Sequence, residues 1–137
     1  MAASLGILAE EFRTLAGLRH PNVVSVLDYG LDAAGQPFYT MELLANAQPL
    51  LQFAHGRLAS QQLELLIQIL HALAYLHRRC IVHRDLTPSN VLVVNGPQGP
   101  VVKVVDFGLA IETERGEAAS LAGTLLYMAP ELFRGEA

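Results

Sequence analysis

The chain has 137 residues, which is enough for one domain and too few for two of ordinary size. Hydrophobic residues make up 52% and charged residues 16%, a composition that excludes an intrinsically disordered protein. The formal charge is −4 and there is no basic run, which argues against nucleic acid or an anionic membrane as the main binding partner.

A helix and a hairpin are predicted in the first third of the chain. Apolar residues at three- and four-residue steps predict an amphipathic helix over 4–19. Pro21 ends it, because proline disfavours a helical conformation in the residue before it. The apolar runs at 23–27 and 37–44 predict two strands of a β-hairpin, and the stretch 46–56 is expected to be irregular.

A longer helix and a second hairpin are predicted next. Ser60 is the expected N-cap of a helix over 60–77. One face of this helix, called here the leucine face, is marked by residues at helical spacing: Leu63, Leu66, Ile67, Leu70, Ala74 and His77. β-Branched runs at 91–94 and 101–105 flank a turn rich in proline and glycine, which predicts the second hairpin.

The same sequence predicts a soluble cytoplasmic protein. No stretch approaches the roughly 18 consecutive apolar residues that a membrane helix needs. The first 11 residues carry two glutamates and no basic region, unlike a signal peptide. The single cysteine, Cys80, permits no internal disulfide, which fits a reducing compartment, and it is expected to be a small buried side chain.

Three short motifs carry the functional information. HRDLTPSN occupies 83–90, DFG occupies 106–108 and APE occupies 129–131. Taken singly, their acidic and amide residues are typical of solvated loops. Together they stand in a fixed order, with Asn90 five residues after Asp85 and 16 before the DFG aspartate. In this order and at these spacings the chain resembles the eukaryotic-type protein kinase family, serine/threonine branch.

The resemblance implies phosphoryl transfer and gives roles to the loop residues. Asp85 would orient the substrate hydroxyl and accept its proton. Asn90 and Asp106 would hold Mg²⁺, a hard cation that prefers oxygen ligands. Arg84 fits kinases whose activation loop is ordered by a phosphate, and equally fits a structural partner for a carboxylate. Thr87, counted with the catalytic set, stands where serine/threonine kinases usually carry a phosphate-contacting lysine.

The resemblance also outlines an ATP site. Glu11 corresponds to the glutamate that pairs with the phosphate-binding lysine, although by itself it is typical of an exposed helix carboxylate. Met41 would be the gatekeeper, and the backbone of Glu42 and Leu44 in the following hinge would bind adenine. Two further residues would form the floor of the pocket, and would look the same as ordinary core residues: Leu92 and Val105.

Other segments extend the resemblance along the chain. Four residues correspond to the stacked hydrophobic spine of the family: Leu15, Val26, His83 and Phe107. The GTLLYM sequence at 123–128 is similar to the serine/threonine branch, so the acceptor is expected to be Ser or Thr. Three hydroxyl side chains lie in the activation segment: Thr113, Ser120 and Thr124.

The chain also departs from the family pattern. It has no glycine-rich loop and no strand lysine, and Lys103 cannot serve because it lies three residues before Asp106. The sequence stops soon after Glu131, so the helical continuation of the family is expected to be missing. The leucine face of the 60–77 helix normally packs on that continuation and is therefore expected to be exposed.

The sequence thus predicts a partial protein kinase domain of the α+β class, with a small-lobe remnant at 1–40, a hinge at 41–46 and a large-lobe portion at 47–137. By resemblance its function is ATP- and Mg²⁺-dependent phosphorylation of Ser or Thr in a protein substrate, with no nucleic-acid partner and no membrane insertion. As a separate chain it is expected to be inactive. The alternative is a catalytically silent pseudokinase or gene remnant that acts by binding a partner, and an unrelated α+β protein is a third reading.

Overall fold

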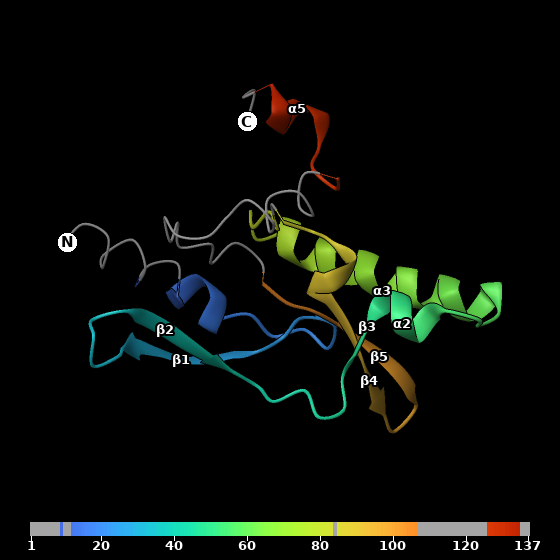
Figure 1. Ribbon diagram of the computed structural model, residues 1–137, viewed down its shortest axis with the longest axis horizontal. Helices are drawn as coiled ribbons and strands as arrows, with labels where there is room; N and C mark the ends of the chain where they lie inside the picture. Colours follow the sequence, from blue (N-terminus) through green and yellow to red (C-terminus); the bar gives the residue numbers. More distant parts are fainter. Residues whose placement is uncertain (1–8, 10–11, 84, 107–125, 135–137) are drawn as a thin grey trace.

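Figure 1 shows the computed structural model of the chain, which describes residues 9, 12–83, 85–106 and 126–134. The two-stranded sheet β1–β2 lies toward one end, and the three-stranded sheet β3–β4–β5 lies with α2 and α3 toward the other. The elements are β1 (Val26–Leu31), β2 (Pro37–Met41), β3 (Gln48–Pro49), α2 (Leu50–Ala54), α3 (Ala59–His77), η1 (Pro88–Asn90), β4 (Val91–Gly96), β5 (Gly99–Val104) and α5 (Pro130–Phe133). The predicted α+β class is confirmed.

The first predicted hairpin is present as β1–β2, with Val26 paired to Met41 and Tyr29 paired to Tyr39. Its first strand, however, begins at Val26 rather than at residue 23. The reason is tertiary: the Val24 N–H donates to the Val104 carbonyl at 3.1 Å, so this stretch pairs with β5 instead of continuing β1. The short segment before β1 thereby ties the two sheets together.

The second predicted hairpin, β4–β5, is also present, and Gly99 supports its turn with a φ of 121° that favours glycine. The stretch expected to be irregular is wrong in part, because it contains β3 and α2. β3 pairs with the start of β4, with Pro49 opposite Leu92. The chain leaving the hinge is therefore fixed to the strand that follows the HRD motif.

The ends of α3 differ from the prediction. The helix begins at Ala59, so Ser60 lies inside it, and the Leu58 N–H donates instead to Gln61 Oε1 at 3.2 Å. At the other end Cys80 adopts a left-handed φ of 58°, and the Ile81 N–H reaches back to the Leu76 carbonyl at 3.1 Å. This is a Schellman-type ending. It places Cys80 at the surface, so the predicted burial of this cysteine is wrong.

Helix α3 has two apolar faces. One face packs on β5 and enters the core through Leu65, Ile69, Ala72 and Leu76. The leucine face is exposed as predicted, from 43% at Ile67 to 62% at Leu70. A helix that is apolar on opposite sides is typical of the interior of a larger protein. No helix in the described ranges is long and apolar enough to cross a bilayer.

A buried amide network, which the sequence analysis missed, joins α3 to the loop before β1. Asn22 is only 7% exposed, and its Nδ2 donates to Gln68 Oε1 at 2.9 Å and to the Val102 carbonyl at 3.0 Å. Gln68 in turn donates from Nε2 to the Pro100 carbonyl at 3.0 Å. Because buried amides need partners, this network fixes the register between α3 and β5.

Candidate functional site

The HRD motif is held by a buried histidine. The side chain of His83 is 3% exposed, and its Nδ1 accepts a hydrogen bond from the Asp85 N–H at 3.1 Å. Since Nδ1 is thereby an acceptor, Nε2 is the nitrogen that donates to the Val105 carbonyl at 2.9 Å. One side chain thus connects the catalytic loop to the residue that precedes the DFG aspartate.

Asp85 and Asn90 form a local pair across the HRDLTPSN loop. Asn90 Nδ2 donates to the Asp85 carbonyl at 2.8 Å and to Asp85 Oδ2 at 3.3 Å. Both partners are acceptors, so the amide nitrogen of Asn90 faces Asp85 and the amide oxygen faces away. The other carboxylate oxygen, Asp85 Oδ1, is buried and has no hydrogen-bond partner among the described residues.

Asp106 lies beside this pair. The Val105 N–H donates to the Asn90 carbonyl at 3.0 Å, which places the end of the β5 segment directly against the catalytic loop. Asp106 itself is exposed and has a left-handed φ of 53°. Its Oδ1 accepts a hydrogen bond from the hydroxyl of Tyr39 at 3.3 Å. Burial, together with the nearby Asp106 carboxylate, raises the pKa of Tyr39, so this hydroxyl stays protonated at neutral pH.

The oxygens of Asn90 and Asp106 suit a hard cation that is held partly by the protein and partly by substrate phosphates. In the part of the chain that the structure describes, no group of three or more His, Cys, Asp or Glu side chains could hold a metal by itself. Magnesium in phosphoryl-transfer sites instead uses one or two protein oxygens together with substrate phosphates. The outward amide oxygen of Asn90 and the exposed carboxylate of Asp106 are two such oxygens.

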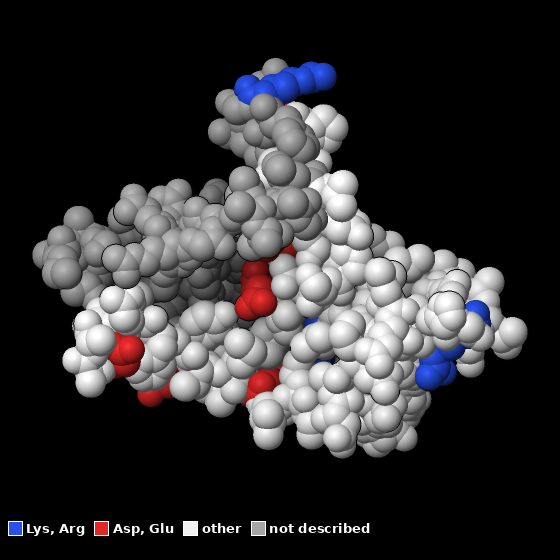
Figure 2. Space-filling view, viewed as in Figure 1, with Lys and Arg blue, Asp and Glu red and all other residues white. Residues whose placement is uncertain are grey.

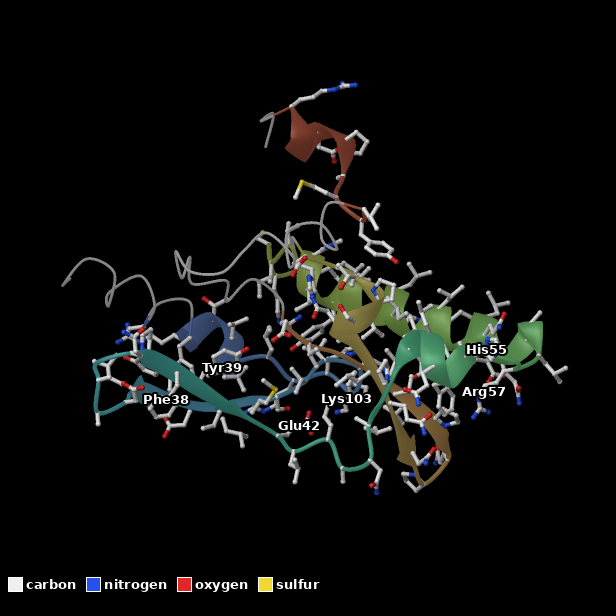
Figure 3. The ribbon with its side chains drawn as sticks, in the orientation of Figure 1. Phe38, Tyr39, Glu42, His55, Arg57 and Lys103 are labelled. Atoms are coloured by element: carbon white, nitrogen blue, oxygen red, sulfur yellow. The ribbon has the colours of Figure 1, made fainter. Side chains whose placement is uncertain are left out.

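The hinge is anchored through a glutamate side chain. Glu42 Oε1 accepts hydrogen bonds from the Ser25 N–H at 2.9 Å and from Lys103 Nζ at 3.1 Å. Figure 3 labels Glu42 and Lys103 on the neighbouring hinge and β5 segments. Partial burial raises the pKa of Glu42, but the hydrogen bonds from Ser25 and the charge of Lys103 outweigh it and lower the pKa below 4.5. From the sequence, only the backbone of Glu42 was expected to take part in the site.

The backbone of the hinge is partly engaged. The Glu42 N–H donates to the Ser25 carbonyl at 2.9 Å, so this N–H is not available to a ligand. Leu44 is partly buried against the core, and Met41 ends β2 with 37% of its surface exposed. Of the two predicted floor residues, Leu92 lies on β4 opposite Lys103, and Val105 is buried directly after β5.

Thr87 is buried and bonded to another hydroxyl. Its Oγ1 lies 2.7 Å from Ser89 Oγ, and its side chain is 8% exposed. η1 begins at Pro88, which suits the first position of a helical turn because proline lacks an N–H. Ser89 was missed by the sequence analysis, since a serine inside the motif carries no signal of its own.

Several predicted residues lie outside the described part of the chain. These are Glu11, Arg84, Phe107 and the three activation-segment hydroxyls, Thr113, Ser120 and Thr124. The other three spine residues are buried: Leu15, Val26 and His83. In the last described stretch, the APE proline and glutamate open α5.

The surface around the site is unevenly charged. Figure 2 shows acidic side chains in the centre and lower left of the visible face, whereas the largest basic areas lie at its right end and near α5.

A cavity of about 60 Å³ lies between α2, α3 and the β4–β5 turn, beside Phe53 and Arg57. This is far below the several hundred Å³ of an ordinary ligand pocket, and none of the catalytic-loop residues lines it.

Comparisons with known proteins agree with the motifs. The protein kinase domain family matches residues 4–137. The DNA damage-responsive serine/threonine-protein kinase RqkA of Deinococcus radiodurans is 42% identical over 135 residues, which cover 91% of this chain and 20% of RqkA. Human serine/threonine-protein kinase D2 is 40% identical over 129 residues, covering 91% of this chain and 15% of that protein.

A solved structure gives the same result for the fold. The crystal structure of Rad53 residues 1–466 in complex with AMP-PNP matches with a TM-score of 0.73 and 32% identity, over 94% of this chain and 32% of that one. The chain spans a fifth or less of the length of the two curated relatives. The chain therefore belongs to the protein kinase domain family, in its serine/threonine branch.

Proposed function

We propose that the chain supplies the catalytic loop, the hinge and the metal ligands of a protein serine/threonine kinase, which transfers the terminal phosphoryl group of ATP to a Ser or Thr hydroxyl of a protein. The observation that carries this proposal is Asp85 Oδ1, a buried carboxylate oxygen without a hydrogen-bond partner among the described residues. Burying a carboxylate oxygen costs free energy unless a hydrogen-bond donor, here one from a ligand, bonds to it. An incoming hydroxyl group would do so.

In this mechanism Asp85 receives the substrate hydroxyl. Asn90 holds Asp85 Oδ2 and the Asp85 carbonyl, so the carboxylate keeps one orientation and Oδ1 is the oxygen that accepts the proton. Phosphoryl transfer depends mainly on positioning and charge stabilisation, because the transition state is loose. The Asn90–Asp85 pair supplies the positioning.

The amide oxygen of Asn90 and the carboxylate of Asp106 would hold Mg²⁺. When bound, Mg²⁺ would neutralise the negative charge that develops on the phosphoryl group during transfer. His83 joins the two segments that carry these residues, since it bonds both to the Asp85 N–H and to the Val105 carbonyl. The Glu42 carbonyl and the Leu44 N–H of the hinge would bind adenine, with Met41, Leu92 and Val105 around the base.

The experiment is a segment exchange. Residues 4–137 of this chain replace the matching segment of RqkA, a relative at 42% identity, to give a protein called here the RqkA chimera. We expect the chimera to phosphorylate a generic acceptor protein with Mg²⁺ and ATP. Asp85→Asn in the chimera keeps the size of the side chain but weakens the proton acceptor, and should lower the rate by a factor on the order of 10² or more.

A second function, a silent binding module, is favoured by one observation only. Thr87 replaces the usual phosphate-contacting lysine, and its hydroxyl is already bonded to Ser89 at 2.7 Å. A folded chimera that lacks activity, while RqkA itself is active in the same assay, would contradict the kinase proposal and support this alternative.

A further inference from the structure

The Tyr39 side chain connects β2, the strand that leads into the hinge, to Asp106 of the DFG motif. Tyr39 lies on β2, two residues before Met41, and is 67 residues away from Asp106 in the sequence. Its hydroxyl is nevertheless 3.3 Å from Asp106 Oδ1. No side-chain hydrogen bond to Asp106 from any other described residue accompanies it.

The strand geometry explains why Tyr39 can reach that position. Alternate residues of a strand face opposite sides, so Phe38 and Thr40 are exposed while Tyr39 is half-buried. Tyr39 pairs directly with Tyr29, and paired residues share a face. Tyr29 stacks on Phe12 with ring centroids 4.6 Å apart, so Tyr39 lies on the covered face of the hairpin. Figure 3 labels Tyr39 on that part of β2.

A hydroxyl from a fixed ring is suited to orient a carboxylate. Asp106 is exposed and follows the end of β5, so without a partner its side chain would be free to rotate. Bonding at Oδ1 leaves Oδ2 as the oxygen that a cation can take. The separation is longer than the roughly 2.7 Å of a relaxed O–H···O bond, and hydrogen bonds in ligand-free sites commonly shorten on ligand binding.

We propose that Tyr39 is a positioning residue for the metal-binding carboxylate: its hydroxyl holds Asp106 Oδ1 and thereby presents Asp106 Oδ2 to the divalent cation that accompanies ATP. This inference rests on the proposed function, since it assigns a cation to Asp106. It also links the strand that leads into the hinge to the metal site.

The test is binding of Mn²⁺–ATP to the RqkA chimera, measured by water-proton relaxation with Mn²⁺–ATP titrated up to millimolar concentrations. Mn²⁺ accepts the same oxygen ligands as Mg²⁺ and is paramagnetic. Tyr39→Phe removes only the hydroxyl and should weaken Mn²⁺–ATP binding about 10-fold, the lower end for loss of a partner of a metal ligand. Tyr29→Phe, the same change in the paired residue, should leave binding unchanged.

Asp106→Asn separates the two proposals. It should weaken Mn²⁺–ATP binding at least as much as Tyr39→Phe, and adding Tyr39→Phe to it should have no further effect. If Asp106→Asn weakens binding and Tyr39→Phe does not, the positioning role is wrong and the metal site stands. If Asp106→Asn binds Mn²⁺–ATP as the unchanged chimera does, or the unchanged chimera binds none, both proposals are overturned.

A second measurement needs no bound metal. With tyrosines labelled by ¹³C at Cζ, Asp106→Asn should shift the Tyr39 resonance and leave the Tyr29 resonance in place. The Cζ shift reports the hydrogen bond of the hydroxyl, whereas a purely structural role of Tyr39 in packing would leave it unmoved. An unmoved Tyr39 resonance would overturn the proposed contact directly.

Discussion

Asp85 and Asp106 are both loop carboxylates, yet their surroundings suit them to different tasks. Asp85 has one oxygen bound by Asn90 and the other buried without a partner in the described residues. Asp106 is exposed and bonded at one oxygen by Tyr39. The first arrangement suits a group that receives a single proton, and the second suits a group that meets a cation beside the nucleotide.

Alanine substitution at the two positions should therefore separate catalysis from binding. In the RqkA chimera, both Asp85→Ala and Asp106→Ala should lower the phosphoryl-transfer rate by a factor on the order of 10² or more. Calorimetric titration with Mg²⁺–ATP should show nearly unchanged affinity for Asp85→Ala and weaker affinity for Asp106→Ala. Full activity in Asp106→Ala would show that the metal ligands have been assigned wrongly.

Thr87→Lys should raise the turnover of the chimera. A lysine at this position places a cation near the transferring phosphoryl group, where negative charge spreads over the equatorial oxygens. Thr87→Met, of similar length without charge, is the matched control and should give no gain. A lower or unchanged rate for Thr87→Lys in a folded protein would mean that the Thr87–Ser89 hydroxyl pair serves this loop better.

The Glu42 carboxylate predicts a pH-dependent part of the stability. Its pKa is lowered in the folded state, so the stability that it adds is present above the ordinary value of 4.5 and is lost as the pH falls through the lower folded-state pKa. In the chimera, Glu42→Gln should therefore lower the melting temperature at pH 7 and differ less from the unchanged protein near pH 4.

Glu64→Gln, at an exposed position on α3, is the control for this effect and should change the melting temperature little at either pH. A difference between Glu42→Gln and the unchanged protein that stays constant from pH 7 to pH 4 would contradict the role given to the Ser25 and Lys103 contacts.

At the scale of elements, residue patterns predicted those strands and helices that are determined by neighbouring residues in the sequence. The β4–β5 hairpin was found because a proline- and glycine-rich turn separates two β-branched runs. The start of β1 was misplaced because the Val23 and Val24 backbone pairs with β5, a long-range contact that strand propensity does not contain. The short α2 was missed for another reason: only five residues form it, too few to show a helical period.

Helix α3 shows the limit of periodicity most clearly. The spacing of Leu63, Leu66, Ile67 and Leu70 identified a real apolar face, and the family resemblance predicted its exposure. The face that actually packs, with Ile69 and Leu76, was not identified, because the helix is apolar on both sides. Which side packs is decided by the partner element, here β5.

Paired substitutions on α3 test these two faces. Leu76→Ala, at a position with 0% exposure, should destabilise the RqkA chimera by about 2–5 kcal/mol in urea unfolding. Leu66 is 53% exposed in the chain, so Leu66→Ala would cost less than about 0.5 kcal/mol if the leucine face stayed uncovered. In the chimera, where helices of RqkA are expected to cover this face, Leu66→Ala should cost clearly more. A cost below about 0.5 kcal/mol for Leu66→Ala in the chimera would contradict that covering.

The candidate site was predicted as a set of residues and not as a set of contacts. The motif spacing located Asp85, Asn90 and Asp106, because those residues are close in sequence to recognisable neighbours. The contacts of Tyr39 with Asp106 and of Glu42 with Lys103 join positions 67 and 61 residues apart. Tyr39 and Lys103 carry no local signal of these contacts, so only the folded chain reveals them.

At the scale of the whole molecule, the 137-residue chain by itself should aggregate or lack a cooperative thermal transition. Full burial of an aliphatic side chain contributes about 1.5–3 kcal/mol, so leaving several leucines exposed removes a large part of a domain's margin of about 5–15 kcal/mol. Size-exclusion chromatography and scanning calorimetry provide the measurement. The double variant Leu66→Gln/Leu70→Gln should aggregate less, because it makes the exposed leucine face polar.

The chain by itself should also show no measurable kinase activity, since its sequence contains neither a glycine-rich loop nor a strand lysine to hold the phosphates. A monomer with a sharp thermal transition and robust Mg²⁺–ATP-dependent phosphorylation would contradict both expectations.

The central claim is that Asp85 promotes phosphoryl transfer to a protein hydroxyl, and phosphoamino-acid analysis tests it most directly. An acceptor protein is incubated with the RqkA chimera and radiolabelled ATP, hydrolysed and separated into phosphoserine, phosphothreonine and phosphotyrosine. Phosphoserine or phosphothreonine should appear with the chimera and fall at least about 100-fold with Asp85→Asn. Equal labelling by the chimera and its Asp85→Asn variant, or labelling of tyrosine alone, would contradict the account.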